Sequence, residues 1–183
     1  APAIPTGTTT GDMMLLYVGG KPFNHTINTP AGWTNLAAGS GANGSVASGV
    51  DTGSVDWATF YREWQSGDGN PTVSVTSGNV TLAVIKSFSK TAPSWMTPVA
   101  AKGSDTSSGT GFSLTMDADP GITANDMLAT FATIAGNNAT FGTPTLTATS
   151  ATIGTVTESP ATEGTTATGN DLESSASHAL CTA

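Results

Sequence analysis

The sequence predicts an all-β fold, a jelly-roll type β-sandwich built from two related halves. Short apolar or alternating runs lie between Gly, Pro and Asn turn signals, and no stretch has a convincing helical period. One segment also recurs: Asp12-Met13 and Thr29-Pro30 reappear 114 residues later as Asp126-Met127 and Thr143-Pro144. This offset is longer than the roughly 20 to 50 residues of a solenoid repeat, so it favours two halves that close over a shared core.

The first half contains three clear strand signals. Residues 13–18 form an apolar run between glycine turns, which predicts a strand buried on both faces. Residues 30–36 form a turn and a short strand, and the Gly- and Ser-rich residues 38–54 predict a surface loop or hairpin. Residues 55–63 alternate with period two and predict a long strand. Residues 72–76 and 80–88 add two further β-type runs after a Gly-Asp-Gly-Asn-Pro turn.

A crossover separates the halves. Residues 90–101 carry Pro93 and Pro98 and show no period, and residues 103–111 resemble a linker in composition. We therefore divide the chain into a first β half at 1–89, a crossover and loop at 90–111, and a second β half at 112–183, all within one shared domain.

The second half begins with alternation over residues 112–116 and turns at 117–121. The repeated strand follows at 127–134, a Thr- and Ala-rich edge or surface strand pair is predicted at 145–156, and a last strand at 175–182. The counterpart of residues 112–116 in the first half would fall before Ala1. Either the first half lacks this strand, or the chain is a fragment, or another subunit supplies the strand by β-augmentation.

Charge limits the classes of partner. Five Lys and Arg against 13 Asp and Glu give a net charge of −8, so a nucleic-acid partner is not expected. Charged residues make up 10% of the chain, against about 25% in an ordinary soluble domain, and hydroxyls and backbone must therefore cover much of the surface. No apolar stretch is long enough to predict a membrane span, and no signal peptide is visible. The lone Cys181 is read as a small buried hydrophobe.

Catalytic and metal-binding signals are weak. The two histidines, His25 and His178, occur without a nucleophile signature, so no enzyme activity and no cofactor are expected. Asp117, Asp119 and Asp126 lie near a Pro-Gly turn and could supply oxygens to a hard cation such as Ca²⁺. The alternative is that these residues only form turns.

The tryptophans pose a sharper question. Trp33, Trp57, Trp64 and Trp95 could stack on sugar rings or meet another subunit, or they could fill a core that is short of large residues. In a regular strand Trp57 and Trp64 fall on opposite faces, so they cannot both enter one core. One of them is therefore expected at an interface with a subunit or a ligand.

The order of these elements resembles the jelly-roll type β-sandwich domains of tailed-phage virion proteins. The resemblance rests on Gly-Asp before the strand at 13–18, Pro-Ala-Gly-Trp-Thr at 30–34, Phe-Tyr-Arg at 60–62 and the turn at 67–71. It covers most of residues 5–90 and is thinner over 112–183, where the Gly-Trp-Thr and Tyr-Arg elements are missing. It implies a fold and a virion setting, and it supplies no catalytic residues.

These observations together predict a non-enzymatic virion structural protein at the particle surface, either a capsid decoration or cement protein or a tail-associated subunit. Its expected partners are other virion subunits, such as the major capsid or tail protein, and further copies of itself. A surface poor in long charged side chains suits such contacts, because little rotamer entropy is lost on burial. The rival hypothesis is a module that binds a carbohydrate or a host receptor through exposed tryptophans, with a surface glycan as partner.

Overall fold

The computed structural model describes residues 1–21, 25–41, 54–78, 80–104, 122–135, 141–158 and 172–182. Within these ranges the regular elements are all β-strands, which confirms the predicted all-β class. The first half forms β1 (Met13–Lys21), β2 (Thr26–Ile27), β3 (Thr34–Gly41), β4 (Val55–Glu63), β5 (Val75–Thr76) and β6 (Val80–Phe88). The second half forms β7 (Met127–Ala135), β8 (Thr152–Ile153), β9 (Thr157–Glu158) and β10 (Leu172–Thr182).

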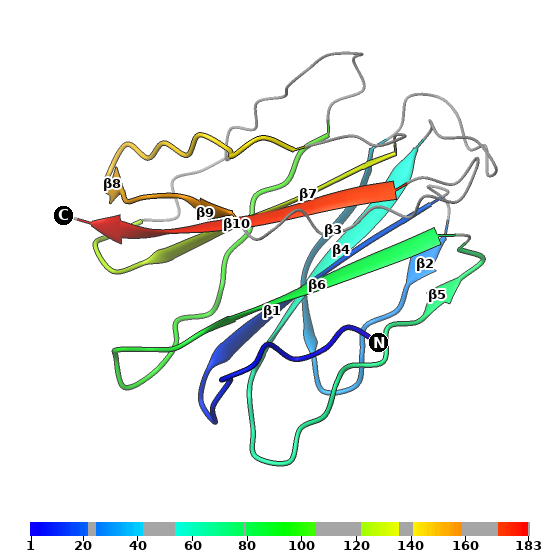
Figure 1. The fold of residues 1–183 in the computed structure, drawn as a ribbon, viewed down its shortest axis with the longest axis horizontal. Helices are drawn as coiled ribbons and strands as arrows, with labels where there is room; N and C mark the ends of the chain where they lie inside the picture. The colour runs from blue at the N-terminus through cyan, green and yellow to red at the C-terminus, as the bar shows by residue number, and fades with distance from the viewer. Residues whose placement is uncertain are drawn as a thin grey trace.

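The strands form two main antiparallel sheets that pack face to face. The first sheet has the order β3-β4-β1-β6, and the second has the order β7-β10-β8, with β9 also paired to β10. A separate pair, β2 with β5, lies beside the first sheet (Figure 1). The two sheets make the predicted β-sandwich, while the jelly-roll connectivity stays a prediction.

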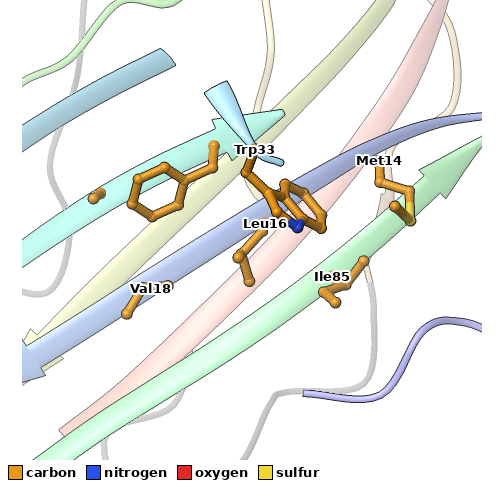
Figure 2. Packing of buried hydrophobic residues seen from close by; sticks show 7 residues of the cluster. Met14, Leu16, Val18, Trp33 and Ile85 are labelled. Carbon is orange, nitrogen blue, oxygen red and sulfur yellow. The ribbon is translucent and has the colours of Figure 1, made fainter. Parts of the chain in front are cut away.

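The main hydrophobic cluster lies on one face of the first sheet. Met14, Leu16 and Val18 of β1 point to this face together with Phe60 and Ala58 of β4 and Ile85 of β6. Trp33, which precedes β3, closes the cluster, and Figure 2 shows its indole among Leu16, Met14 and Ile85. Burying one such large apolar side chain stabilises the fold by roughly 1.5–3 kcal/mol. This cluster explains why the even-numbered positions of β1 are apolar.

The opposite face of the first sheet packs against the second sheet. Tyr17 of β1 stacks on Phe131 of β7, with ring centroids 5.2 Å apart and ring planes 8° from parallel. Gly19 permits the close approach of Thr133, because a Cβ at Gly19 would lie 2.3 Å from the Thr133 hydroxyl. β1 is therefore buried on both faces, as its continuous apolar run predicts.

The turn that precedes β1 recurs before β7. The backbone N–H of Thr9 donates to Asp12 Oδ2 over 2.8 Å, and the N–H of Thr123 donates to Asp126 Oδ2 over 2.7 Å. The residue before each aspartate has a left-handed backbone, with φ of 95° at Gly11 and 74° at Asn125. Gly and Asn are the residues that adopt this conformation at least cost.

The matching turns lead into matching strand pairs. Trp64 exchanges backbone hydrogen bonds with Gly11 and Asp12 in the first half, and Cys181 does so with Asn125 and Asp126 in the second. β7 and β10 then repeat the register of β1 and β4, because Tyr17 faces Thr59 and Phe131 faces Ala176. The predicted relationship between the two halves is thus present in the hydrogen bonding.

The duplication is incomplete at the buried positions of the second half. The positions of Leu16 and Phe60 in the first half correspond by register to Thr130 and Ser177. Ser177 is only 1% exposed, and its hydroxyl has no hydrogen-bond partner among the described residues. The second half therefore buries smaller and more polar side chains than the first.

The remaining segment predictions differ in outcome. The crossover at 90–101 contains no strand, as expected, and the stretch 145–156 contains only the two-residue strand β8. Residues 42–53 and residues 112–116 lie outside the described residues, so most of the surface loop or hairpin predicted at 38–54 and the strand signal at 112–116 stay predictions.

Candidate functional site

Three of the four tryptophans are held within the fold. Trp33 is 8% exposed and belongs to the main hydrophobic cluster, so its ring is not available as a platform for a ligand. Trp64 packs against the same cluster. The indole Nε1–H of Trp95 donates to the Gly11 carbonyl over 2.7 Å and ties the crossover segment to the turn before β1.

Trp57 lies on the other face of β4 from Trp64, as the period of the strand predicts. Its ring stacks on Tyr17, with centroids 6.3 Å apart, and thus extends the stack that Tyr17 makes with Phe131. Gly39 of β3 and Gly19 of β1 stand opposite Trp57 on the neighbouring strands. Gly39 leaves room for the indole, since a Cβ at Gly39 would lie 2.8 Å from it. Trp57 thus packs where the two sheets of the same chain meet, and the interface with a subunit or a ligand expected at one of Trp57 and Trp64 stays a prediction.

A groove lies between β2 and the ends of β3 and β4. It has a volume of about 390 Å³ and holds a histidine and a carboxylate, with His25 Nδ1 3.8 Å from Asp56 Oδ2. Burial raises the pKa of Asp56, although the charge and the backbone N–H of His25 act in the opposite direction. The lining residues are His25, Thr26, Ile27, Ala38, Gly39, Ser40, Asp56, Trp57 and Ala58. The groove thus offers hydrogen-bonding groups beside an aromatic residue.

The predicted cation loop is only partly described. Asp126 accepts hydrogen bonds from both the backbone N–H and the hydroxyl of Thr123, which is the turn-forming role. Asp117 and Asp119 lie outside the described residues. Among the residues that are described, no three His, Cys, Asp or Glu side chains gather as a metal site requires.

A second histidine lies where the two sheets meet. His178 Nδ1 of β10 is 3.5 Å from Lys86 Nζ of β6, and the His178 ring meets Phe88 edge-on at 5.5 Å between centroids. Burial lowers the pKa of His178, and the charge of Lys86 lowers it further. Burial also lowers the pKa of Lys86. Neutral His178 can therefore accept a hydrogen bond from Lys86 across the joint between the halves.

The single cysteine is not a reactive group. Cys181 is 1% exposed, and burial raises the pKa of its thiol, with a further contribution from the Asp126 carboxylate. This agrees with its interpretation as a small buried hydrophobe.

The second sheet exposes large apolar side chains. Met127 and Ile134 of β7 are 38% and 42% exposed, and Leu180 of β10 is 45% exposed. Met13, the counterpart of Met127, is only 7% exposed, because β6 runs beside β1 and places Phe88 opposite Met13. In the described part of the chain β7 pairs with β10 alone.

Sequence reasoning missed the groove and the Lys86–His178 contact. Both bring together side chains from strands that are far apart in the sequence, His25 with Asp56 and Lys86 with His178. Lys86, the one charged residue in the run 80–88, was the available signal, because a buried lysine needs a polar neighbour.

Comparisons of the chain with protein-family models, with curated proteins and with solved structures found no match. No helix that could span a membrane occurs in the part of the chain that the structure describes.

Proposed function

We propose that this chain is a non-enzymatic structural subunit of a virion, a capsid decoration or cement protein or a tail-associated subunit, that acts through protein–protein contacts. The observation that carries the proposal is the contrast between two equivalent methionines. Met13 is covered by β6, whereas Met127 is 38% exposed beside its cross-strand partner Leu180, which is 45% exposed. A neighbouring pair of exposed large apolar side chains is the kind of feature that marks a surface which binds another protein.

Composition supports the same function. Only 10% of the residues are charged, and β7 carries no charged residue along its nine positions. Such a surface can pack closely against a neighbour without desolvating charges, which is costly. The virion setting comes from the sequence resemblance over residues 5–90, and the surface of the particle is the location that a decorating or tail-associated subunit would occupy.

Incorporation into particles tests this function. Mass spectrometry of purified particles from the source of the chain is expected to detect it, and Met127→Lys is expected to reduce its amount by more than about tenfold, since a buried charge at a contact is costly. Gln65→Lys, which adds the same charge at an exposed polar position, is the matched control. Particles that lack the chain altogether would overturn the proposal.

The second candidate is a carbohydrate- or receptor-binding module. The groove with His25, Asp56 and Trp57 favours it, because sugar sites combine hydrogen-bonding groups with an aromatic ring. A glycan array and a titration of tryptophan fluorescence distinguish the two functions. Saturable sugar binding that is lost in Asp56→Ala and retained in Asp68→Ala would favour the module over the purely structural subunit.

A further inference from the structure

We propose that the Lys102–Gly103 peptide bond is a proteolytic processing site for a protease of the trypsin class, and that cleavage leaves two polypeptides which stay together as one sandwich. Such a protease holds the basic side chain before the cleaved bond in a pocket with a carboxylate at its base. Water adds across the peptide bond, which gives a carboxylate on Lys102 and an amine on Gly103. The inference goes beyond the proposed function and does not depend on it, since it concerns the joint between the halves.

The basic residues of the strands are protected from such a protease. The chain has five Lys and Arg residues, and the structure describes all of them. Lys21 of β1 and Lys86 of β6 are buried, with 0% and 9% exposure. Arg62 lies in β4, which is paired with a strand on each side, and its guanidinium forms an ion pair with Asp68. A peptide bond inside a paired strand reaches a protease only after the strand opens locally.

The two remaining basic residues lie in the crossover and differ in their contacts. Lys90 Nζ donates to Glu63 Oε1 over 2.9 Å in an ion pair, and the Lys90 side chain is 27% exposed. Lys102 is exposed, and its Nζ donates to the Ala38 carbonyl over 2.8 Å. A carboxylate in a protease pocket can replace this neutral acceptor, because charge-assisted hydrogen bonds are the stronger ones. Lys102 is therefore the basic residue that a protease captures at least cost.

The backbone around this bond is open to a protease. Residues 96–104 contain no strand, and they make no backbone–backbone hydrogen bond with other described residues. Met96 and Val99 are 80% and 67% exposed, and Gly103 and Ser104, which follow the bond, are both exposed and small. Exposed segments with small and polar residues are the preferred places for proteolytic nicking. A protease can thus bind this segment without breaking a strand pair.

The topology explains why the two products should stay together. The first sheet consists of strands that precede the bond and the second sheet of strands that follow it, so cleavage divides no sheet among the described residues. The sheets meet through side chains, because Tyr17 stacks on Phe131 and Phe88 meets His178 edge-on. The hydrogen bond from the Trp95 indole to the turn before β1 lies within the first product. Cleavage therefore removes a covalent link and leaves the packing between the sheets in place.

Limited digestion of the folded full chain with trypsin tests the proposal. Mass spectrometry of the intact products is expected to show a first cut after Lys102, which gives residues 1–102 and 103–183. Loss of the uncut chain should slow by at least about tenfold in Lys102→Gln, because the other sites require local opening or release of an ion pair. Lys90→Gln, which removes the other basic residue of the crossover, is the matched control and should change the rate by less than about twofold.

Size-exclusion chromatography under native conditions should then elute the two products as one species, at the position of the uncut chain. Circular dichroism confirms that both variants are folded and should show that the cleaved wild type keeps its β-structure. A first cut at any other basic residue overturns the proposal, as does a folded chain that resists trypsin under conditions that digest the urea-unfolded chain. Products that separate or unfold after cleavage would also overturn it, because the crossover would then be what holds the halves together.

Discussion

At the residue scale, the smallest side chains decide how closely the two sheets approach. Gly19 of β1 stands under Thr133 of β7, where a Cβ would come within 2.3 Å of the hydroxyl oxygen and 3.0 Å of the methyl carbon. No ordinary Cβ fits there without a shift of the sheets. A glycine in the middle of an apolar strand marks such a close approach.

Gly19→Ala is therefore expected to lower the free energy of unfolding by about 1–3 kcal/mol, as overpacking does in well-packed interiors. Urea denaturation measures the change. Thr133→Ala removes the two atoms nearest to the added Cβ. The double variant should therefore lose less stability than the sum of the losses in the two single variants. Gly69→Ala is the control, because nothing lies within 4 Å of a Cβ there. Equal stability of the Gly19 and Gly69 variants would contradict the close approach.

Asp12 gives a second prediction at this scale. The backbone hydrogen bond from Thr9 holds the pKa of Asp12 below its ordinary value of 3.8, against the opposing effect of burial. A carboxylate with a lowered folded-state pKa stabilises the fold above pH 3.8, and this contribution is lost as the pH falls through the folded-state value. Urea midpoints at decreasing pH should therefore fall less steeply for Asp12→Asn than for the wild type. If the urea midpoints of the variant and the wild type fell equally with decreasing pH, the turn would not depend on this carboxylate.

The roles of single residues were the hardest part to predict from sequence. Trp33 and Asp126 belong to types that suit a ligand platform and a cation site, and only their neighbours assign them to the core and to a turn. The His25–Asp56 contact is likewise a product of strand packing. Composition identifies the chemical groups that are present, but tertiary structure determines which of them meet.

At the element scale, prediction succeeded where period and turn signals agree. The run at 80–88 matches β6, the alternation at 55–63 matches β4, and the repeated motif places β1 and β7. β3 extends to Gly41, farther than predicted, because its Ala-, Gly- and Ser-rich sequence has weak strand preference and its pairing with β4 determines its length. The second half diverges from the first after Pro144. Thr34 of β3 pairs with Tyr61 of β4, and the offset of 114 residues would place its counterpart at residue 148. The residue that pairs with His178, the equivalent of Tyr61 in β10, is instead Thr157.

The stack between equivalent strands is a testable property of these elements. Tyr17 and Phe131 occupy the same position in the two copies of the repeat, and they contact each other across the sandwich. A double-mutant cycle with Tyr17→Leu and Phe131→Leu is expected to give a coupling energy of about 0.5–1.5 kcal/mol in urea denaturation. Additive losses would mean that the two rings contribute independently and would argue against a shared interface.

At the scale of the whole molecule, the joint between the halves is expected to be sensitive to pH. Burial and the Lys86 charge lower the pKa of His178 below its ordinary value of 6.5, so the folded state disfavours the protonated ring. Stability is then fully present above pH 6.5 and declines as the pH falls from there through the folded-state pKa. Besides Lys86 of β6 and Lys21 of β1, the charged groups on the described strands around β10 are Glu173 of β10 itself and Glu158 of β9, and Glu158 accepts a hydrogen bond from Ser175.

The melting temperature of the wild type should fall as the pH is lowered through this range, and it should fall less in His178→Gln. His178→Gln keeps a polar side chain at the site and cannot carry a charge, so it isolates the protonation step. A profile that is unchanged by this substitution would assign the acid sensitivity to other groups.

The central proposal for the whole molecule is that it is a structural subunit of a virion that binds its neighbours through exposed apolar side chains of the second sheet. Cryo-electron microscopy of purified particles tests this claim most directly. The account predicts density for the β-sandwich at the particle surface, with the exposed side chains Met127 and Leu180 covered by a neighbouring subunit. Particles without this density, or a bound molecule whose second sheet faces solvent, would contradict it.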